Sequence, residues 1–394
     1  MIAPTDPTVT PTAGDTMPPA PPEPFKLAPV GSGFDVAKSM RWVRQTYGLG
    51  TARQLREMAT LTLSSCRLSP DEYIRYALFR PSLPMTEKKT FLSVLSAARI
   101  NRRLSLPGRR FASLMAHKAL AGLYLRGAGL PTTPMLALFA PGAPVPGIRH
   151  LDDAAALARY LSEEAPLPCF GKPIDGSFAI GGVAFVGREA RRLLLSDGNS
   201  MTAEEFAAAV IRNFPRGYLF QPLLRMHPAL QPVCGQAAGS LRITTLMTPR
   251  GPEPLYACFK LPGKTAMTDG PSEEKPNGMA AVDLRSGQFQ RAQFNSHTNL
   301  ETMTEALVAP VPLAGIAVPD MARAVELACE AQRLYPTHGT LGIDVIVTED
   351  GPLIGEVNSN PMPTLYQRSA DRGILNPEFR ARFAETEAWM KSRA

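Results

Sequence analysis

The spacing of apolar residues predicts helices in the first quarter of the chain. Leu55, Met58 and Ala59 stand at i, i+3 and i+4, the spacing of a helix that buries one face. The segment Ser69–Glu72 has the composition of a helix start, with proline at the first helical position and acids in the first turn. A second apolar face follows at residues 91–98. We therefore expect a helical segment over about residues 36–103, and it carries no chemical motif of its own.

From residue 111 onward, short apolar runs alternate with glycine and proline turns, which is typical of β-strands. These runs fall at residues 135–140, 168–172, 182–186, 192–196, 218–223, 241–248, 255–261, 279–284, 288–294, 342–348 and 353–357. Helical patterns occur at residues 118–127, 203–213 and 320–334, and residues 377–391 predict a terminal amphipathic helix. This mixed order of strands and helices indicates an α+β architecture with antiparallel sheets.

The N-terminal segment has a different composition from the rest of the chain. Residues 1–30 are dominated by proline, threonine and alanine, so they have little apolar surface to bury and few backbone donors. We expect a disordered or polyproline-like leader here. It lacks the basic and apolar regions of a signal peptide, and no run of about 18 apolar residues occurs anywhere, so we expect no membrane span.

Five cysteines are scattered along the 394 residues and form no CxxC pair. This pattern argues against a disulfide framework and against a zinc site. Small buried side chains in a reducing compartment explain the cysteines, so we expect a cytoplasmic protein.

The net charge of +7 is unevenly distributed. Residues 35–118 hold 16 Lys/Arg and 5 Asp/Glu, an excess of 11 positive charges, so the rest of the chain sums to −4. The excess permits an acidic partner such as a nucleotide, a phosphorylated sugar or an anionic membrane surface; helices with solvated basic faces are the alternative. Because the segment lacks an interleaved aromatic platform and a helix-turn-helix pattern, we expect no nucleic-acid partner.

The most informative motif lies near the C-terminus, where two apolar strands flank a turn at Asp350-Gly351. Asp344 interrupts the first strand, and Glu356 and Asn358 stand two apart, on one face of the second. Two carboxylates and an amide oxygen on adjacent strands suit a hard cation that also takes ligands from phosphates, as Mg²⁺ does. A solvated hairpin whose polar residues merely face water is the alternative.

Two lysines precede this motif in positions that suit phosphate binding. Lys172 ends a predicted strand and precedes a glycine-punctuated loop at residues 176–182, whose N–H groups can wrap phosphate oxygens. The lysine comes before the glycines, so this is no Walker A loop, and an ordinary turn is the alternative. Lys118 opens the helix predicted at residues 118–127, where a surface lysine is the alternative.

The order of these three motifs resembles the ATP-grasp superfamily, over about residues 111–366. More narrowly, the chain looks like the ATP-grasp proteins associated with sugar transfer and capsule or exopolysaccharide biosynthesis, which are related to α-L-glutamate ligases. The segments Leu68–Tyr73, Gln221–Leu230 and Ser240–Thr245 carry this narrower resemblance.

The resemblance implies an ATP-grasp fold, in which two α+β lobes with antiparallel sheets clamp ATP. It divides the chain into the leader (1–33), a basic helical module (34–110), an N-terminal lobe (111–225), a C-terminal lobe with the metal site (226–370) and a C-terminal helix (371–394). Many relatives carry an α/β domain before the first lysine, where this chain has the helical module. Relatives also commonly have an arginine just before the metal-binding aspartate, where this chain has Gly342-Ile343.

The resemblance also implies residue roles for ATP and Mg²⁺. Asp344, Glu356 and Asn358 match the family's magnesium ligands. The nucleotide set comprises Lys118, Lys172, Gly176, Ser177, Gly181, Gln221, Pro222, Leu224, His227 and Lys260. Within this set, the hinge Gln221–Leu224 would read adenine through backbone groups, and Pro222 can still supply a carbonyl.

The roles implied for His227 and Arg242 each have an equally simple alternative. His227 would bind the ribose, but a half-buried loop histidine fits the sequence equally well. Arg242 would steady the transferred phosphoryl group as a catalytic residue beside Lys172, but an exposed strand arginine competes with that role. Lys260 is a weaker candidate of the same type.

By the resemblance, the activity is that of an ADP-forming carboxylate–amine ligase that activates its acid as an acyl phosphate. Its partners would be a small carboxylate, an amine or sugar substrate, and proteins of glycan biosynthesis. A kinase on the same fold and a non-catalytic nucleotide-binding scaffold remain as alternatives.

Overall fold

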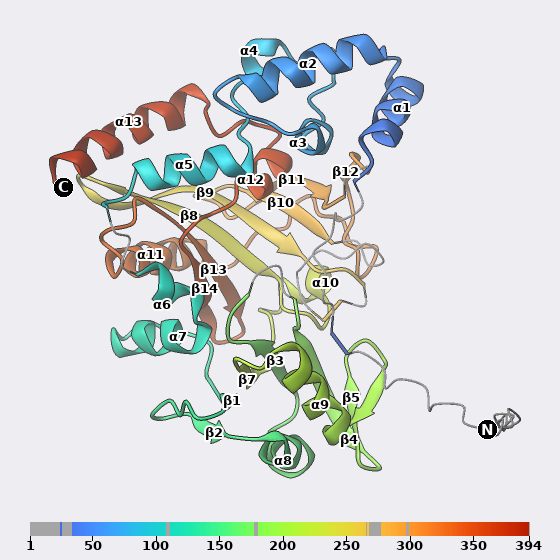
Figure 1. The fold of residues 1–394 in the computed structure, drawn as a ribbon, viewed down its shortest axis with the longest axis vertical. Helices are drawn as coiled ribbons and strands as arrows, with labels where there is room; N and C mark the ends of the chain where they lie inside the picture. The colour runs from blue at the N-terminus through green and yellow to red at the C-terminus, as the bar shows by residue number, and fades with distance from the viewer. Residues whose placement is uncertain are drawn as a thin grey trace, which may run out of the picture.

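The computed structural model describes residues 24–25, 34–107, 111–176, 180–264, 266–267, 277–296 and 299–393 (Figure 1). The prediction for Ser177 and most of the predicted leader lie outside the described residues. Phe25 of the leader is described: it is 6% exposed and stacks edge-on against Phe206 and Phe214. This part of the leader therefore contributes to a hydrophobic core.

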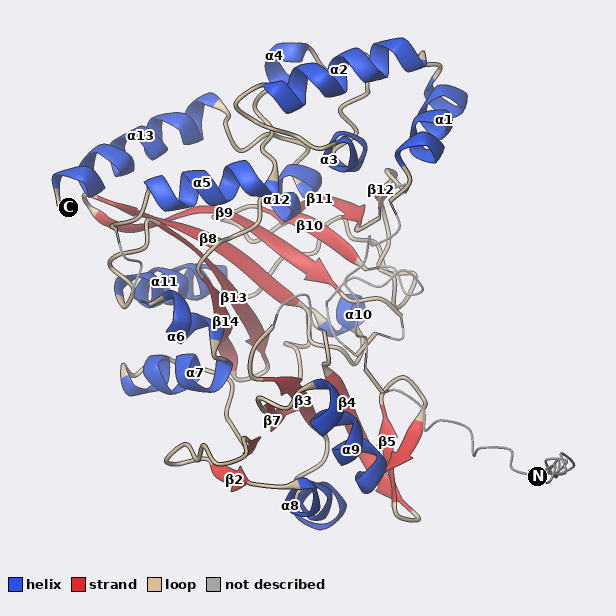
Figure 2. Cartoon of the chain, in the orientation of Figure 1, coloured by secondary structure: helices blue, strands red, loops and turns tan. Residues whose placement is uncertain are grey.

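Two seven-stranded sheets form the framework (Figure 2). The first sheet has the order β2-β1-β7-β3-β4-β5-β6. Its strands are β1 (Ala137–Phe139), β2 (Arg149–Leu151), β3 (Cys169–Pro173), β4 (Val183–Glu189), β5 (Arg192–Leu195), β6 (Ser200–Thr202) and β7 (Tyr218–Pro222). All its pairs are antiparallel except β1–β2, which is parallel and departs from the expectation of purely antiparallel sheets.

The second sheet is antiparallel throughout, in the order β12-β11-β10-β9-β8-β13-β14. Its strands are β8 (Ser240–Thr248), β9 (Gly251–Leu261), β10 (Gly278–Val282), β11 (Phe289–Phe294), β12 (Thr302–Met303), β13 (Thr340–Thr348) and β14 (Gly351–Asn358). The expected α+β fold of two sheet-based lobes is confirmed.

Helices cover these sheets and precede them in the chain. The N-terminal ones are α1 (Val36–Tyr47), α2 (Thr51–Leu63), α3 (Pro70–Arg75), α4 (Met85–Lys88) and α5 (Val94–Arg103). The remainder are α6 (Ala112–Ala116), α7 (Lys118–Gly127), α8 (Ala154–Arg159), the π-helical turn η1 (Tyr160–Glu164), α9 (Ala203–Asn213), α10 (Gln231–Cys234), α11 (Met321–Arg333), α12 (Thr364–Ser369) and α13 (Pro377–Ser392). The helices predicted at residues 118–127 and 203–213 are confirmed. No described helix is both long and apolar enough to cross a membrane.

The helix predicted to start at Ser69 is confirmed, but it is shorter than the apolar run that follows it. A capping box forms there, because the Ser69 and Glu72 side chains each accept a backbone N–H of the other. The helix ends at Arg75, and Ala77 has a positive φ of 51°. An L-residue rarely adopts this conformation within a helix, so the run up to Phe79 turns away.

The two faces of the second sheet carry different layers of helices (Figure 1). Leu241 and Ile243 of β8 pack in one core with residues of α11. Leu246 and Cys258 pack on the opposite face, in a core with helices α1–α5, α12 and α13. Since side chains alternate along a strand, Arg242 points to the same face as Cys258, its partner across the ladder. The helical module therefore covers the face that carries Arg242.

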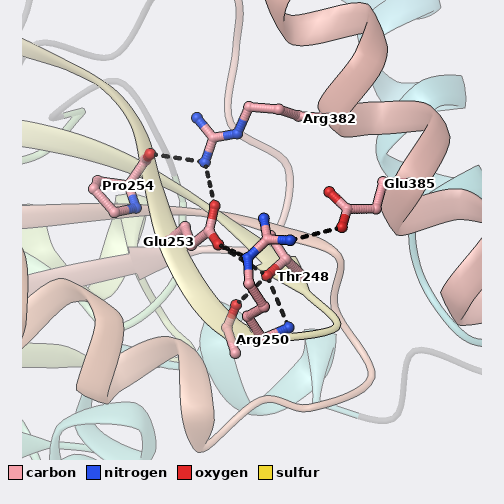
Figure 3. A network of polar contacts seen from close by, with 7 residues as sticks. Thr248, Arg250, Glu253, Pro254, Arg382 and Glu385 are labelled. Carbon is pink, nitrogen blue, oxygen red and sulfur yellow. Dashed lines mark hydrogen bonds and ion pairs between the residues drawn. The ribbon is translucent and has the colours of Figure 1, made fainter.

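Two ion pairs anchor helix α13 to the turn before β9 and to the first residues of β9 (Figure 3). Glu385 accepts from Arg250 at 2.9 Å, and Arg382 donates to Glu253 at 3.0 Å and to the carbonyl of Pro254 at 3.1 Å. Arg250 also bonds Glu253 at 3.0 Å, which joins the two pairs into one network.

A buried ion pair stabilises the interior of the helical module. Lys88, 1% exposed, donates to Glu57 at 2.6 Å. The same carboxylate accepts from Tyr73 at 2.8 Å and from Arg53 at 3.0 Å. The carboxylate is thus bonded from three elements of the module, which offsets the cost of burying it.

Candidate functional site

A cavity of about 700 Å³ lies between the two sheets. It is lined by most of the predicted site residues, namely Lys118, Lys172, Gly176, Gln221, Pro222, Leu224, Arg242, Lys260, Asp344, Glu356 and Asn358. These residues come from segments spread over more than half of the chain. The fold therefore brings the lysine, hinge and acidic motifs to one place.

Asp344 is the most strongly bonded residue of this cavity. It is 5% exposed, and its two oxygens accept from Arg242 at 2.5 Å and 2.8 Å. Lys260 donates to the same carboxylate at 3.3 Å. Burial raises the pKa of Asp344, but the positive charges of Arg242 and Lys260 outweigh burial and lower that pKa to about 2. The carboxylate is therefore ionised at neutral pH.

Strand register explains why Arg242 meets Asp344. Strand β13 lies between β8 and β14, and Asp344 stands directly opposite Arg242 on one side and Glu356 on the other. Only 12% of the Arg242 side chain is exposed, so the alternative of an exposed strand arginine is wrong. Arg242 supplies a cation beside Asp344 from the neighbouring strand, although Gly342-Ile343 precedes Asp344 in the chain.

The donor set around Asp344 fits a hard divalent cation. The predicted hairpin is confirmed, with Asp344 opposite Glu356 and Gly342 opposite Asn358. Asn358 donates to the carbonyl of Gly342 at 3.4 Å through its amide nitrogen, which leaves the amide oxygen as an acceptor. Two carboxylates and an amide oxygen form an all-oxygen set, the chemistry that Mg²⁺ prefers. Within the described residues, no group of three or more His, Cys, Asp or Glu side chains could hold a metal ion, so the candidate set rests on two carboxylates and an amide.

Lys118 links the start of α7 to this acidic hairpin. Its ammonium group donates to the carbonyl of Gly176 at 2.9 Å and lies 3.8 Å from Glu356. Its backbone N–H bonds the carbonyl of Ile174, at the end of the strand that holds Lys172. Only 13% of the Lys118 side chain is exposed, so the surface-lysine alternative is wrong.

Strands β3 and β7 position the second lysine beside the hinge. Lys172 pairs with Leu219 and Phe170 pairs with Gln221 across the antiparallel ladder. Gln221 is 6% exposed and, like Phe170, lines the cavity. The strand lysine and the hinge therefore form neighbouring parts of one wall.

Two predicted residues lie away from the cavity lining. Gly181 accepts a 2.7 Å hydrogen bond from Tyr218 through its carbonyl and has a φ of 75°. A Cβ at Gly181 would overlap the Phe214 ring, so this glycine is required by packing and by its turn. His227 bonds the carbonyl of Val347 through its backbone, and its ring accepts from the N–H of Ala229.

Several residues that line the cavity had no predicted role in the site. Arg67, Ser69, Arg75 and Val94 come from the helical module, and Arg368 comes from α12. Ser69 lies in a segment that carries the family resemblance, but none of the five belongs to a motif with chemical meaning. The packing of the module and of α12 over the second sheet brings them to the cavity.

Comparisons with known proteins agree with this architecture. A family model described as sugar-transfer associated ATP-grasp matches residues 104–380, more than half of the chain. A search of curated proteins finds no match.

A search of solved structures finds similarity to the D-alanine–D-alanine ligase from Coxiella burnetii, with 14% identity and a TM-score of 0.39. The match covers 71% of this chain and 59% of the ligase. The biotin carboxylase from Campylobacter jejuni is 11% identical with a TM-score of 0.42, and the match covers 72% of this chain and 48% of the carboxylase. The D-Ala:D-Ser ligase from Enterococcus faecalis is 14% identical with a TM-score of 0.38, and the match covers 71% of this chain and 62% of the ligase. The chain thus spans less than two thirds of the length of these proteins.

Proposed function

Because the chain belongs to the sugar-transfer associated ATP-grasp family, we propose that it is an ADP-forming ligase that activates a carboxylate with ATP and joins it to an amine or similar nucleophile. One observation carries the proposal: Lys118, Lys172, Arg242, Asp344 and Glu356 all line one cavity. Taken one at a time, these motifs could have been a surface lysine, an ordinary turn and a solvated hairpin. In the fold they form a single site with cationic and acidic side chains.

In this proposal the two lysines hold the ATP phosphates. Lys118 of α7 and Lys172 of β3 supply ammonium groups to the cavity, and the backbone of Gly176 contributes to the same phosphate site. The hinge Gln221–Leu224 binds adenine through its backbone groups, and the side of Phe170 offers an apolar surface nearby.

Asp344, Glu356 and Asn358 would hold Mg²⁺, which supplies charge neutralisation on the phosphates when it is bound. Asp344 also bonds both Nε and Nη2 of Arg242 and so fixes the guanidinium plane. Arg242, held in this way, is oriented to stabilise the charge on the transferred phosphoryl group, with Lys260 beside it.

The proposed ligase reaction has two steps, a substitution at the γ-phosphorus of ATP and then a substitution at the acyl carbon. A carboxylate oxygen of the substrate attacks the γ-phosphorus, the bond from that phosphorus to the β-bridging oxygen breaks, and ADP leaves. The amine then attacks the acyl carbon, phosphate leaves, and the amine loses a proton to solvent. The residues of this chain contribute mainly by positioning and by electrostatic stabilisation.

The test is ATP-dependent product formation across amino acids and sugar acids, read by mass, with hydroxylamine added to trap the intermediate. An acyl phosphate gives a hydroxamate, whereas a phosphorylated hydroxyl group does not, so the trap separates a ligase from a kinase. Glu356→Gln should abolish turnover, and the exposed hairpin residue Glu349 offers the matched control Glu349→Gln. Unchanged ADP release by Glu356→Gln would overturn the metal assignment, and no ADP release by the wild type with any acid would favour a scaffold.

The same proposal extends to the organisation and setting of the chain. We assign ATP binding to lobes at residues 111–225 and 226–370, flanked by the module at 34–110 and the helix at 371–394. All five cysteines are buried free thiols, which supports a cytoplasmic setting where ATP is also present. The family description supports a substrate and partners from glycan biosynthesis.

A further inference from the structure

The cavity continues beyond the residues assigned to ATP and the metal. Its far wall is formed by Arg67 and Ser69 before the start of α3, by Arg75 at the end of α3, by Val94 at the start of α5, and by Arg368 of α12. These elements cover the face of the second sheet from which Arg242 projects. The extension is therefore continuous with the place where the phosphoryl group would be transferred.

Arg368 is a buried cation on this far wall. It is 2% exposed, and its Nη atoms donate to the carbonyls of Ser296 and Phe294. Its buried Nε–H has no acceptor, and within the described residues no carboxylate hydrogen-bonds or ion-pairs with it. Burial and, after it, the nearby charge of Arg75 lower the pKa of Arg368 to about 10. A buried guanidinium in such surroundings is stabilised by an anion.

The neighbouring acids are already engaged by other groups. Asp371 bonds Arg80 at 2.6 Å and Arg291 at 3.0 Å, while Asp71 bonds Arg75 at 3.1 Å. The Glu72 carboxylate accepts from the backbone N–H groups of Ser69 and Val94.

A second cavity of about 220 Å³ also borders Arg75 and Arg368. The charged residues lining the two cavities around α3 and α12 are Arg67, Arg75, Arg80, Arg291, Arg368, Asp71, Glu72 and Asp371. Among the described lining residues, these five arginines outnumber the three acids by two charges.

Building on the proposed ligase function, we propose that Arg368 and Arg75 bind an anionic group of the acceptor-side substrate, remote from the carboxylate that is activated. The substrate is then an acid with two anionic groups: the reacting carboxylate near Arg242, and a second carboxylate or a phosphate at the far wall. The helical module acts as the specificity wall of the site. A guanidinium suits both oxyanions, because its N–H groups match the geometry of each.

Ligand series of graded length test the proposal without knowledge of the natural substrate. Succinate, glutarate and adipate are compared with butyrate, valerate and hexanoate, which lack the second carboxylate. 3-Phosphoglycerate against glycerate tests a phosphate as the second anion, because both ligands keep the carboxylate. Dissociation constants are measured by calorimetry on the full chain, with and without magnesium and a non-hydrolysable ATP analogue.

We expect at least one two-anion ligand to bind about 30-fold or more tightly than its counterpart, since removing one partner of a buried charge pair has an effect of this size. Arg75→Gln and Arg368→Lys should each reduce the ratio of the two dissociation constants, one-anion ligand over two-anion ligand, at least tenfold. Arg56→Gln removes the same charge from an exposed position of α2 and should preserve the ratio. Arg368 also bonds backbone carbonyls, so Arg368→Lys could fold poorly. The Arg75 side chain is 24% exposed, so Arg75→Gln still tests the proposal in that case.

The outcomes separate this inference from the ligase proposal. The anion site is overturned if the wild-type ratios are near one in both series. It is also overturned if Arg75→Gln and Arg368→Lys leave those ratios unchanged. ATP binding is measured separately: a chain that prefers two-anion ligands but binds no ATP would retain the anion site and lose the ligase function.

Discussion

Replacing Asp344 by Asn tests the central electrostatic contact of the site. The substitution keeps the size of the side chain and removes its charge, so Arg242 remains buried without its carboxylate. The pKa of Asp344 falls from 3.8 to about 2 in the folded chain. At about 1.4 kcal/mol per pKa unit, the ionised carboxylate contributes about 2–3 kcal/mol to the free energy of unfolding at pH 7.

The sign of the pH dependence follows from the lowered pKa. A carboxyl group with a depressed folded-state pKa stabilises the fold above the unfolded-state value, near 4, and that stabilisation disappears as the pH falls towards 2. The difference between wild type and Asp344→Asn should therefore be constant from pH 7 to 5 and should shrink below pH 4.

Urea unfolding monitored by circular dichroism measures this difference. Asp350→Asn makes the same change at the exposed turn of the same hairpin and should alter the free energy of unfolding by less than about 0.5 kcal/mol. In a double-mutant cycle, Arg242→Met added to Asp344→Asn should cost less than the sum of the single changes. Equal stability of Asp344→Asn and Asp350→Asn at pH 7 would refute the reasoning.

Three further predictions concern the framework. Lys88→Met should destabilise the helical module by about 3 kcal/mol in urea unfolding, because Glu57 stays buried without its ammonium partner; a loss below about 0.5 kcal/mol would show that the pair is unimportant. Gly339→Ala should lower the melting temperature by several degrees, since a Cβ there would overlap the backbone carbonyl of Leu104; an unchanged melting temperature would contradict that contact. Native protein should show less than one thiol reactive towards a disulfide reagent and five after denaturation, because all cysteines are buried and burial raises the pKa of Cys169 to about 12; rapid native labelling would contradict this.

Local sequence patterns were sufficient for several elements. The helix at residues 118–127 and the helix at 203–213 follow from apolar spacing and from capping residues, both of which act within a few positions. The hairpin that carries Asp344, Glu356 and Asn358 follows from two alternating strands joined by a short turn. The parallel pairing of β1 and β2 was missed, because strand direction depends on how distant segments pack.

The sequence by itself determined which residue types could bind phosphates and a metal, and in which order they occur along the chain. Only the tertiary structure decided which of them meet: Arg242 reaches Asp344 across 102 positions through strand register, whereas His227 lies away from the cavity. Arg75 and Arg368 belong to no motif; Arg75 reaches the cavity because the helical module packs on the second sheet, and Arg368 because α12 packs on the same face. The physical reason is range: periodicity and capping are local interactions, whereas register and the burial of a shared face are set by the whole fold.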